Sequence, residues 1–181
     1  LPASAMQGKR LPLTDAQRRI WFLDHFEPQQ SSYNIPTVLR LRGPLNLNAL
    51  EQAFTELARR HEALRALFPS ANGEPTQIIC EPKPIQLPVT DLRHLPQSER
   101  EERANAMAVQ EGRRSYALSS PMLRPFLWQL AENDHLLLIV THELACDAYS
   151  ARLLVKELTA LYGAFATSTA PALPDPAIRY E

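Results

Sequence analysis

The sequence predicts an α/β fold in which helices cover an open mixed sheet. Short runs rich in aliphatic and β-branched residues alternate along the chain with amphipathic segments of helical spacing. Two of the apolar runs flank a four-residue polar loop, the pattern of an antiparallel hairpin. The 181 residues are 45% hydrophobic and 22% charged, enough for one sizeable core. We therefore expect a mixed-sheet sandwich.

The first helix is predicted to begin at Thr14, whose hydroxyl can cap it. Its expected apolar positions are Ala16, Ile20, Leu23 and Phe26, widened by Trp21 and Phe22, with Gln17, Arg18 and Asp24 elsewhere on its surface. Residues 37–42 alternate apolar and polar side chains as a half-buried strand does.

The clearest surface helix follows from Leu45, with Asn46 or Asn48 as its cap, the latter having Glu51 as a capping-box partner. It runs into residues 59–68, whose end resembles a strand. Residues 71–74 form a hairpin-type turn, and residues 76–80 return as another strand.

The second half of the chain begins with a proline-rich connector and a short strand at residues 87–90. Ser98 and Glu101 predict a capping box that opens a charged helix lasting to about Arg114. Residues 123–130 and 135–141 form the hairpin, and a last helix has its apolar stripe at Leu154, Leu158, Leu161 and Phe165.

Charge and composition restrict the partners. The formal net charge is -1, so no overall field favours nucleic acid or an anionic membrane. No apolar run approaches the roughly 20 residues of a membrane span, and we expect a cytoplasmic protein. Cys80 and Cys146 are expected to be free thiols, since the cytosol disfavours disulfides.

Prolines mark the ends of the predicted domain. Several of the 16 prolines gather in residues 171–176, which predicts a boundary there. Residues 1–10 are expected to be an upstream linker.

The candidate site is the turn that follows the apolar run 136–140. His142 can relay a proton near neutral pH or be hydrogen-bonded within the turn, and its spacing alone favours the second role. Glu143 offers a base or a solvated charge. Asp147 can cap the next helix or pair with a cation such as Arg65, and capping is favoured by the residues alone.

A metal site is not expected at this turn. The sequence His142-Glu143-x-x-Cys146 is similar to the zinc motif His-Glu-x-x-His, but that motif needs both ligands one helical turn apart. Here they follow a strand, and no other segment supplies the remaining ligands. A serine-hydrolase elbow and a phosphate-binding glycine loop are also absent from the sequence.

Four motifs together resemble the condensation domains of nonribosomal peptide synthetases. Residues 13–23 resemble the family motif Ser-x-Ala-Gln-x-Arg followed by an aromatic, and residues 60–68 resemble Arg-His-Glu-x-Leu-Arg-Thr-x-Phe. Residues 121–124 resemble Pro-Leu-x-Arg, and residues 141–150 resemble the active-site motif His-His-x-x-x-Asp-Gly. Their order and separation match across nearly the whole chain.

The resemblance implies one lobe of a chloramphenicol acetyltransferase-like fold, with residues 11–170 as the N-terminal lobe and residues 171–181 as the start of the crossover to a C-terminal lobe. It also implies donor and acceptor carrier proteins as partners, together with adjacent synthetase domains and the C-terminal lobe. No cofactor is expected to bind directly, because the phosphopantetheine arms belong to the carriers. The implied reaction is amide formation by attack of an amine on a thioester.

The resemblance assigns roles to individual residues. His142 matches the first histidine of the motif, and Asp147 with Arg65 matches an aspartate–arginine pair, so it favours the salt bridge over the cap. Glu143 stands where the family has its second histidine, and Ala148 replaces the glycine. His142, Glu143 and Asp147 are thus the candidate catalytic residues, with Arg65, Ala148 and Ser150 as structural support of the turn.

These two departures predict impaired condensation. A solvated glutamate is an anion at neutral pH and would repel a developing oxyanion. A methyl group at position 148 narrows a place where glycine permits close approach, and it is strained if φ is positive there. The alternatives are a non-catalytic docking platform for a carrier protein or a trans-acting tailoring enzyme, and an epimerising, cyclising or hydrolytic variant of the family.

Overall fold

The structure is a computed structural model that describes residues 8–26, 31–71 and 73–174. Its elements, in chain order, are β1 (Lys9–Leu11), α1 (Asp15–Phe26), β2 (Asn34–Arg42), α2 (Leu47–Arg60), the 3-10 helix η2 (Glu62–Arg65), β3 (Ala66–Leu67), β4 (Ser70–Ala71), β5 (Glu74–Pro75), β6 (Gln77–Ile79), β7 (Val89–Asp91), α3 (Gln97–Arg113), β8 (Leu123–Ala131), β9 (Asp134–His142) and α4 (Ala148–Ala166). The ends of the predicted linker and crossover, residues 1–7 and 175–181, lie outside the described residues.

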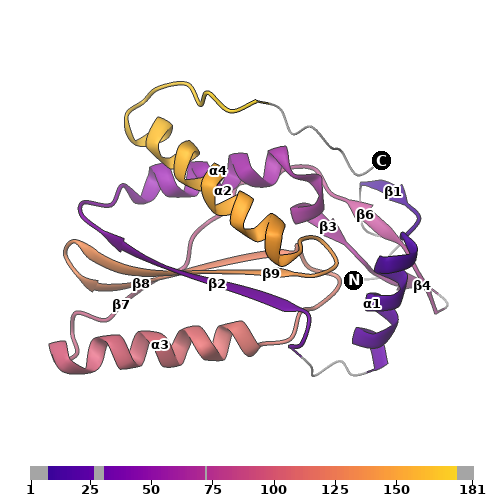
Figure 1. Cartoon of the computed structure of the whole chain (residues 1–181), viewed down its shortest axis with the longest axis horizontal. Coiled ribbons are helices and arrows are strands. Elements are labelled where there is room, and N and C mark those ends of the chain that lie inside the picture. Colours follow the sequence, from indigo (N-terminus) through magenta and orange to yellow (C-terminus); the bar gives the residue numbers. More distant parts are fainter. Residues whose placement is uncertain (1–7, 27–30, 72, 175–181) are drawn as a thin grey trace.

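A four-stranded sheet in the order β2-β9-β8-β7 forms the centre of the molecule. Its β2–β9 and β8–β9 pairs are antiparallel, and its β7–β8 pair is parallel. Helices α2 and α4 cover one face and α3 covers the other, while α1 lies beside the smaller β1-β6-β3 sheet (Figure 1). The predicted α/β mixed-sheet sandwich is confirmed.

Strand β9 is buried on both faces, which explains its uninterrupted apolar run. Leu137 and Ile139 belong to the core cluster beneath α2 and α4. Leu136, Leu138 and Val140 belong to the second cluster, on the α3 side. Since successive side chains of a strand point to opposite faces, one strand contributes to two cores.

The predicted apolar face of α1 is wrong. Its buried residues are Gln17, Trp21 and Asp24, whereas Phe26 is 68% exposed. Phe22 and Leu23 are exposed as well. Hydrophobic periodicity cannot identify an inward helix face whose polar side chains find buried partners.

Two of the predicted helix caps are confirmed. The Thr14 hydroxyl accepts from the backbone N–H of Gln17 at 3.2 Å, and the Gln17 side chain accepts from the N–H of Thr14 at 3.0 Å. Asn46, rather than Asn48, caps α2 by accepting from the N–H of Ala49 at 3.1 Å.

The capping box predicted at Ser98 is wrong. Helix α3 begins at Gln97, and its N-cap Pro96 makes no side-chain capping bond. Glu101 instead lies 3.6 Å from Arg40 on β2, so the helix is tied to the sheet by an ion pair at this point.

The hairpin prediction is confirmed, with a shorter loop. Strands β8 and β9 pair antiparallel with a register shift near their turn, and residues 132–133 connect them instead of four residues. Strand β7 begins two residues later than the predicted start at residue 87. Within the described ranges, no helix is long and apolar enough to cross a membrane.

Replacing Phe54 tests the core beneath α2 and α4. Phe54 is 0% exposed, so Phe54→Ala should leave a cavity and lower the free energy of unfolding by about 3–5 kcal/mol. Urea denaturation monitored by circular dichroism measures the loss. The matched control is Phe26→Ala on the exposed face of α1, which should change stability by less than about 0.5 kcal/mol. Equal losses in both variants would contradict this description of the core.

Candidate functional site

The turn between β9 and α4 is held at its C-terminal end by Asp147. Its carboxylate accepts from the N–H of Ser150 at 2.7 Å and so caps α4. The Ser150 side chain and, to a lesser degree, this backbone hydrogen bond hold the pKa of Asp147 below its ordinary value, because both favour the ionised form. Asp147 is exposed and acts as a helix cap.

The predicted pair of Arg65 with Asp147 is wrong. The Arg65 guanidinium donates to the carbonyl of Ala58 at 3.1 Å and to that of Cys80, and it lies 3.6 Å from Glu62. No ion pair joins Arg65 to Asp147, both of which are described residues. The half-buried guanidinium is already used to hold the end of α2 against the segment after β6.

His142 is the last residue of β9 and is only 1% exposed. Its Nδ1 accepts from the N–H of Leu144 at 3.3 Å. Its Nε2 lies 3.7 Å from Oδ1 of Asp24, a carboxylate on α1 that is itself buried. The ring is therefore used on both sides for structural contacts, in agreement with the role that its spacing favoured.

Two tyrosines surround the His142 ring. Tyr116 meets it edge-on with centroids 5.2 Å apart, and Tyr33 lies 6.1 Å away. The Tyr116 hydroxyl donates to the carbonyl of Val140 at 2.6 Å, and burial raises the pKa of this hydroxyl well above its usual range. The Arg124 guanidinium lies 3.9 Å above the Tyr116 ring, a cation–π contact that clamps the tyrosine in place.

Glu143 differs from His142 because it is exposed. Its backbone N–H donates to the carbonyl of Tyr33 at 2.9 Å, which ties the turn to the segment before β2. The turn thus presents the Glu143 carboxylate to solvent from a backbone that is fixed on both sides.

Ala148 is exposed at the first position of α4 and carries no backbone strain. Among the described residues other than glycine, only Ser168 has a positive φ. The strain that a positive φ would cause at position 148 is absent, so the methyl group acts only by occupying space.

The remaining polar groups of the turn offer little chemistry. Cys146 in the turn is a free thiol, as is Cys80 just after β6, and both were expected to be so. Burial raises the pKa of the Cys146 thiol to about 11, so the reactive thiolate is scarce at neutral pH. Across residues 8–26, 31–71 and 73–174, no group of three or more His, Cys, Asp or Glu side chains is arranged to hold a metal ion.

Several residues that hold the turn were not predicted as site residues. Gln17 donates from Nε2 to the carbonyl of Leu144 at 3.2 Å, and Asp24 faces His142 from the same side of α1. Tyr33 and Tyr116 lie far away in the sequence. Gln17 and Arg124 fall within the family motifs, which was the only sequence signal for them.

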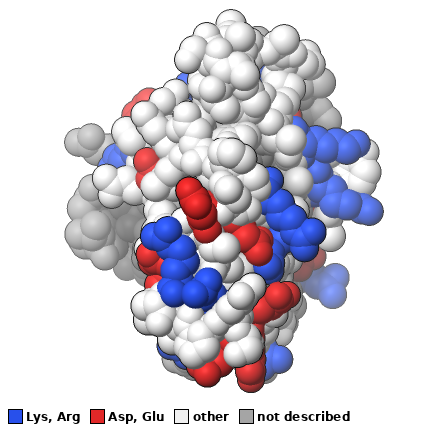
Figure 2. Space-filling view, turned by 90° about the vertical axis from the view of Figure 1, so that its left-hand side faces the viewer, with Lys and Arg blue, Asp and Glu red and all other residues white. Residues whose placement is uncertain are grey.

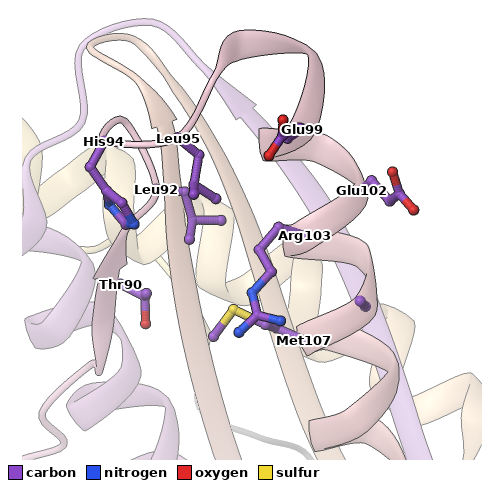
Figure 3. A pocket seen from close by; sticks show the side chains of 9 residues that line it. Thr90, Leu92, His94, Leu95, Glu99, Glu102, Arg103 and Met107 are labelled. Atoms are coloured by element: carbon purple, nitrogen blue, oxygen red, sulfur yellow. The ribbon is translucent and has the colours of Figure 1, made fainter.

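A separate groove of about 710 Å³ lies between β7 and α3. Leu92, Leu95 and Met107 form its apolar lining, and His94 and Arg103 come from its two walls (Figure 3). Since β8 separates β7 from β9, this groove is distinct from the turn.

Figure 2 shows basic and acidic side chains interspersed over one end of the molecule.

The role of Asp147 as a cap predicts a stability that depends on pH. Asp147→Ala should lower the free energy of unfolding by about 0.5–2 kcal/mol at neutral pH. Because the pKa of Asp147 is lowered by folding, its contribution is present above the pKa of the unfolded chain and is lost as the pH falls through the folded value. Urea denaturation at neutral pH and at about pH 2 measures both effects.

Asp147→Asn is the matched control, because asparagine caps helices about as well but does not titrate. It should retain most of the stability at neutral pH and lose less than the native chain on acidification. An alanine variant as stable as the native chain at neutral pH would rule out the cap.

The chain matches proteins of known family along nearly all of its length. A family model for the condensation domain matches residues 7–180. Phosphinothricin tripeptide synthetase PhsC of Streptomyces viridochromogenes is 41% identical over 171 residues, which are 94% of this chain and 16% of that protein. A component of linear gramicidin synthase from Brevibacillus parabrevis is 38% identical over 175 residues, 96% of this chain and 3% of that protein.

Solved structures of related domains have the same fold as this chain. The X-domain from teicoplanin biosynthesis, solved in complex with OxyB, superposes with a TM-score of 0.84 and 30% identity over 97% of this chain and 37% of that one. The starter condensation domain of rhizomide synthetase superposes with a TM-score of 0.83 at 23% identity, over 93% of this chain and 41% of that one. At this identity the similarity shows a shared fold only. The chain spans well under half of each of these relatives. With its motifs, its fold and a family model matched over residues 7–180, the chain belongs to the condensation-domain family of nonribosomal peptide synthetases.

Proposed function

We propose that the chain is the N-terminal lobe of a condensation domain and that Glu143 impairs its amide-forming step. The proposed reaction joins a carrier-tethered acyl or aminoacyl thioester to the amine of a second carrier-tethered substrate. The lobe would supply the turn at residues 142–147, and a C-terminal lobe would complete the tunnel. In this proposal residues 11–170 form the lobe and residues 171–181 begin the crossover.

The exposed Glu143 carboxylate is the observation that carries the proposal. It is presented to solvent beside the buried His142, at the position that matches the second histidine of the family motif. An amine attacking a thioester passes through a tetrahedral intermediate with a developing oxyanion. A fixed negative charge there opposes the stabilisation that one oxyanion-hole donor supplies, which is typically about 2.7–4 kcal/mol.

Glu143 could still accept a proton from the attacking amine. A carboxylate is a weaker base than a neutral imidazole at neutral pH, and once ionised it has no proton to donate. It can therefore replace only part of what a histidine offers at this position. The buried thiol of Cys146 and the buried ring of His142 offer no substitute at the surface of the turn.

The proposed partners are donor and acceptor carrier proteins, the adjacent synthetase domains and the C-terminal lobe. The phosphopantetheine arms of the carriers would bring both substrates to the turn, so the lobe needs no cofactor of its own. Membership of the family supports a cytoplasmic location.

Exchange of Glu143 tests the proposal in the complete condensation domain. With both carriers loaded, the native protein should form amide slowly. Glu143→His should raise the rate, by up to the roughly 10²-fold that a positioned general base contributes. Mass spectrometry of the carrier-bound product measures the rate.

Glu132→His is the control, because Glu132 is exposed at the opposite end of β9 and should leave the rate unchanged. A normal rate in the native protein that is lost in Glu143→Ala would contradict impairment and make Glu143 the working base. An epimerised, cyclised or hydrolysed product would instead assign one of the variant activities of the family.

A docking platform is the second candidate function. Apolar side chains are exposed on both helices that flank the turn: Phe22, Leu23 and Phe26 on α1, and Tyr149 and Leu153 on α4. Exposed aromatic side chains are typical of protein interfaces. The X-domain, to which the chain is similar, was solved in complex with OxyB.

Binding without turnover distinguishes the platform. Titration calorimetry of the complete domain against the neighbouring carrier and candidate tailoring enzymes should detect a complex that forms no amide. Phe26→Glu should weaken that complex at least about tenfold, as expected for the loss of a central aromatic contact. Val109→Glu, at an exposed apolar residue of α3, is the matched control. Equal affinity in Phe26→Glu and the native protein would exclude this surface.

A further inference from the structure

Asp24 is a carboxylate buried inside the molecule. It lies on α1 between exposed aromatic residues, yet it is only 7% exposed. Burying a carboxylate is costly unless a partner compensates for its lost hydration. His142 is such a partner, because its Nε2 lies 3.7 Å from Oδ1 of Asp24.

The hydrogen-bond pattern defines the tautomer of His142. Nδ1 accepts the N–H of Leu144, so a neutral ring carries its proton on Nε2. Nε2 is the ring nitrogen near α1, and it lies 3.7 Å from Oδ1 of Asp24, which is longer than a hydrogen bond. A second group that orients an imidazole in this way commonly fixes both its tautomer and its rotation.

Helix α1 contacts the turn at two points. Gln17 donates to the carbonyl of Leu144, and Asp24, two helical turns later on the same face, meets His142. Leu144 is therefore held through both its N–H and its C=O, while the N–H of Glu143 is held by Tyr33. The exposed Glu143 lies between these fixed backbone groups.

We propose that Asp24 is a positioning residue for the turn. Its carboxylate holds the His142 ring with Nδ1 on the N–H of Leu144, and this fixes the direction in which the side chain at position 143 leaves β9. The inference rests on the proposed function only in treating position 143 as the working position. The contact itself exists without substrate.

Nuclear magnetic resonance of the full chain tests the proposal without carriers or substrates. In the native chain labelled with ¹⁵N-histidine, His142 should be the Nε2–H tautomer, its signals being those lost in His142→Gln. Asp24→Asn removes the charge at nearly the same size. Hydrogen exchange of the Leu144 amide should then become roughly tenfold faster, the effect of weakening about one hydrogen bond.

The amide of Leu138, at the centre of β9, separates a local effect from general destabilisation. Its exchange should not change in Asp24→Asn, and Asp15→Asn on the exposed start of α1 should change neither amide. An Nδ1–H tautomer in the native chain, an unchanged Leu144 amide, or equal acceleration of both amides would overturn the proposal. If Asp24→Asn does not fold, the native tautomer decides. Failure here would leave the amide-forming proposal standing, because no condensation is measured.

Discussion

The geometry of the turn depends on one buried imidazole. His142 ends the central strand, and its ring is contacted by Asp24 from α1, by the N–H of Leu144 and by the Tyr116 ring. Arg124 on β8 lies over Tyr116, so the neighbouring strand also supports the ring. These contacts come from separate parts of the chain, so α1, β8 and β9 all contribute to holding the ring.

The burial of β9 on both faces makes this arrangement rigid. Alternate residues of the strand belong to the two core clusters, so neither face can shift without disturbing a core. Its antiparallel neighbours β2 and β8 pair along almost its full length. A side chain at the end of such a strand is directed by the whole sheet, and a loop alone would not provide that precision.

The sequence predicted the sheet, the hairpin and the position of the turn. These features have local signals, namely the continuous apolar run of a strand buried on both faces and the polar residues of the loops. It failed at α1, where Gln17 and Asp24 are buried and Phe26 is exposed. Periodicity treats polar residues as outward-facing and cannot detect partners more than a hundred residues away. The pairing of Arg65 with Asp147 failed for a related reason: both residues can make several contacts, and only the fold determines that Asp147 caps α4 while Arg65 binds carbonyl groups.

The structure separates the residues that hold the turn from those that face the solvent. His142 and Asp24 are buried and lie 3.7 Å apart, whereas the side chains of Glu143 and Ala148 are exposed. A substitution at an exposed position typically changes stability by only about 0.5 kcal/mol. The fold can therefore tolerate different side chains at position 143. For this reason the family match and the fold rest on the buried residues, whereas the proposed impairment of amide formation rests on the charge of one exposed side chain.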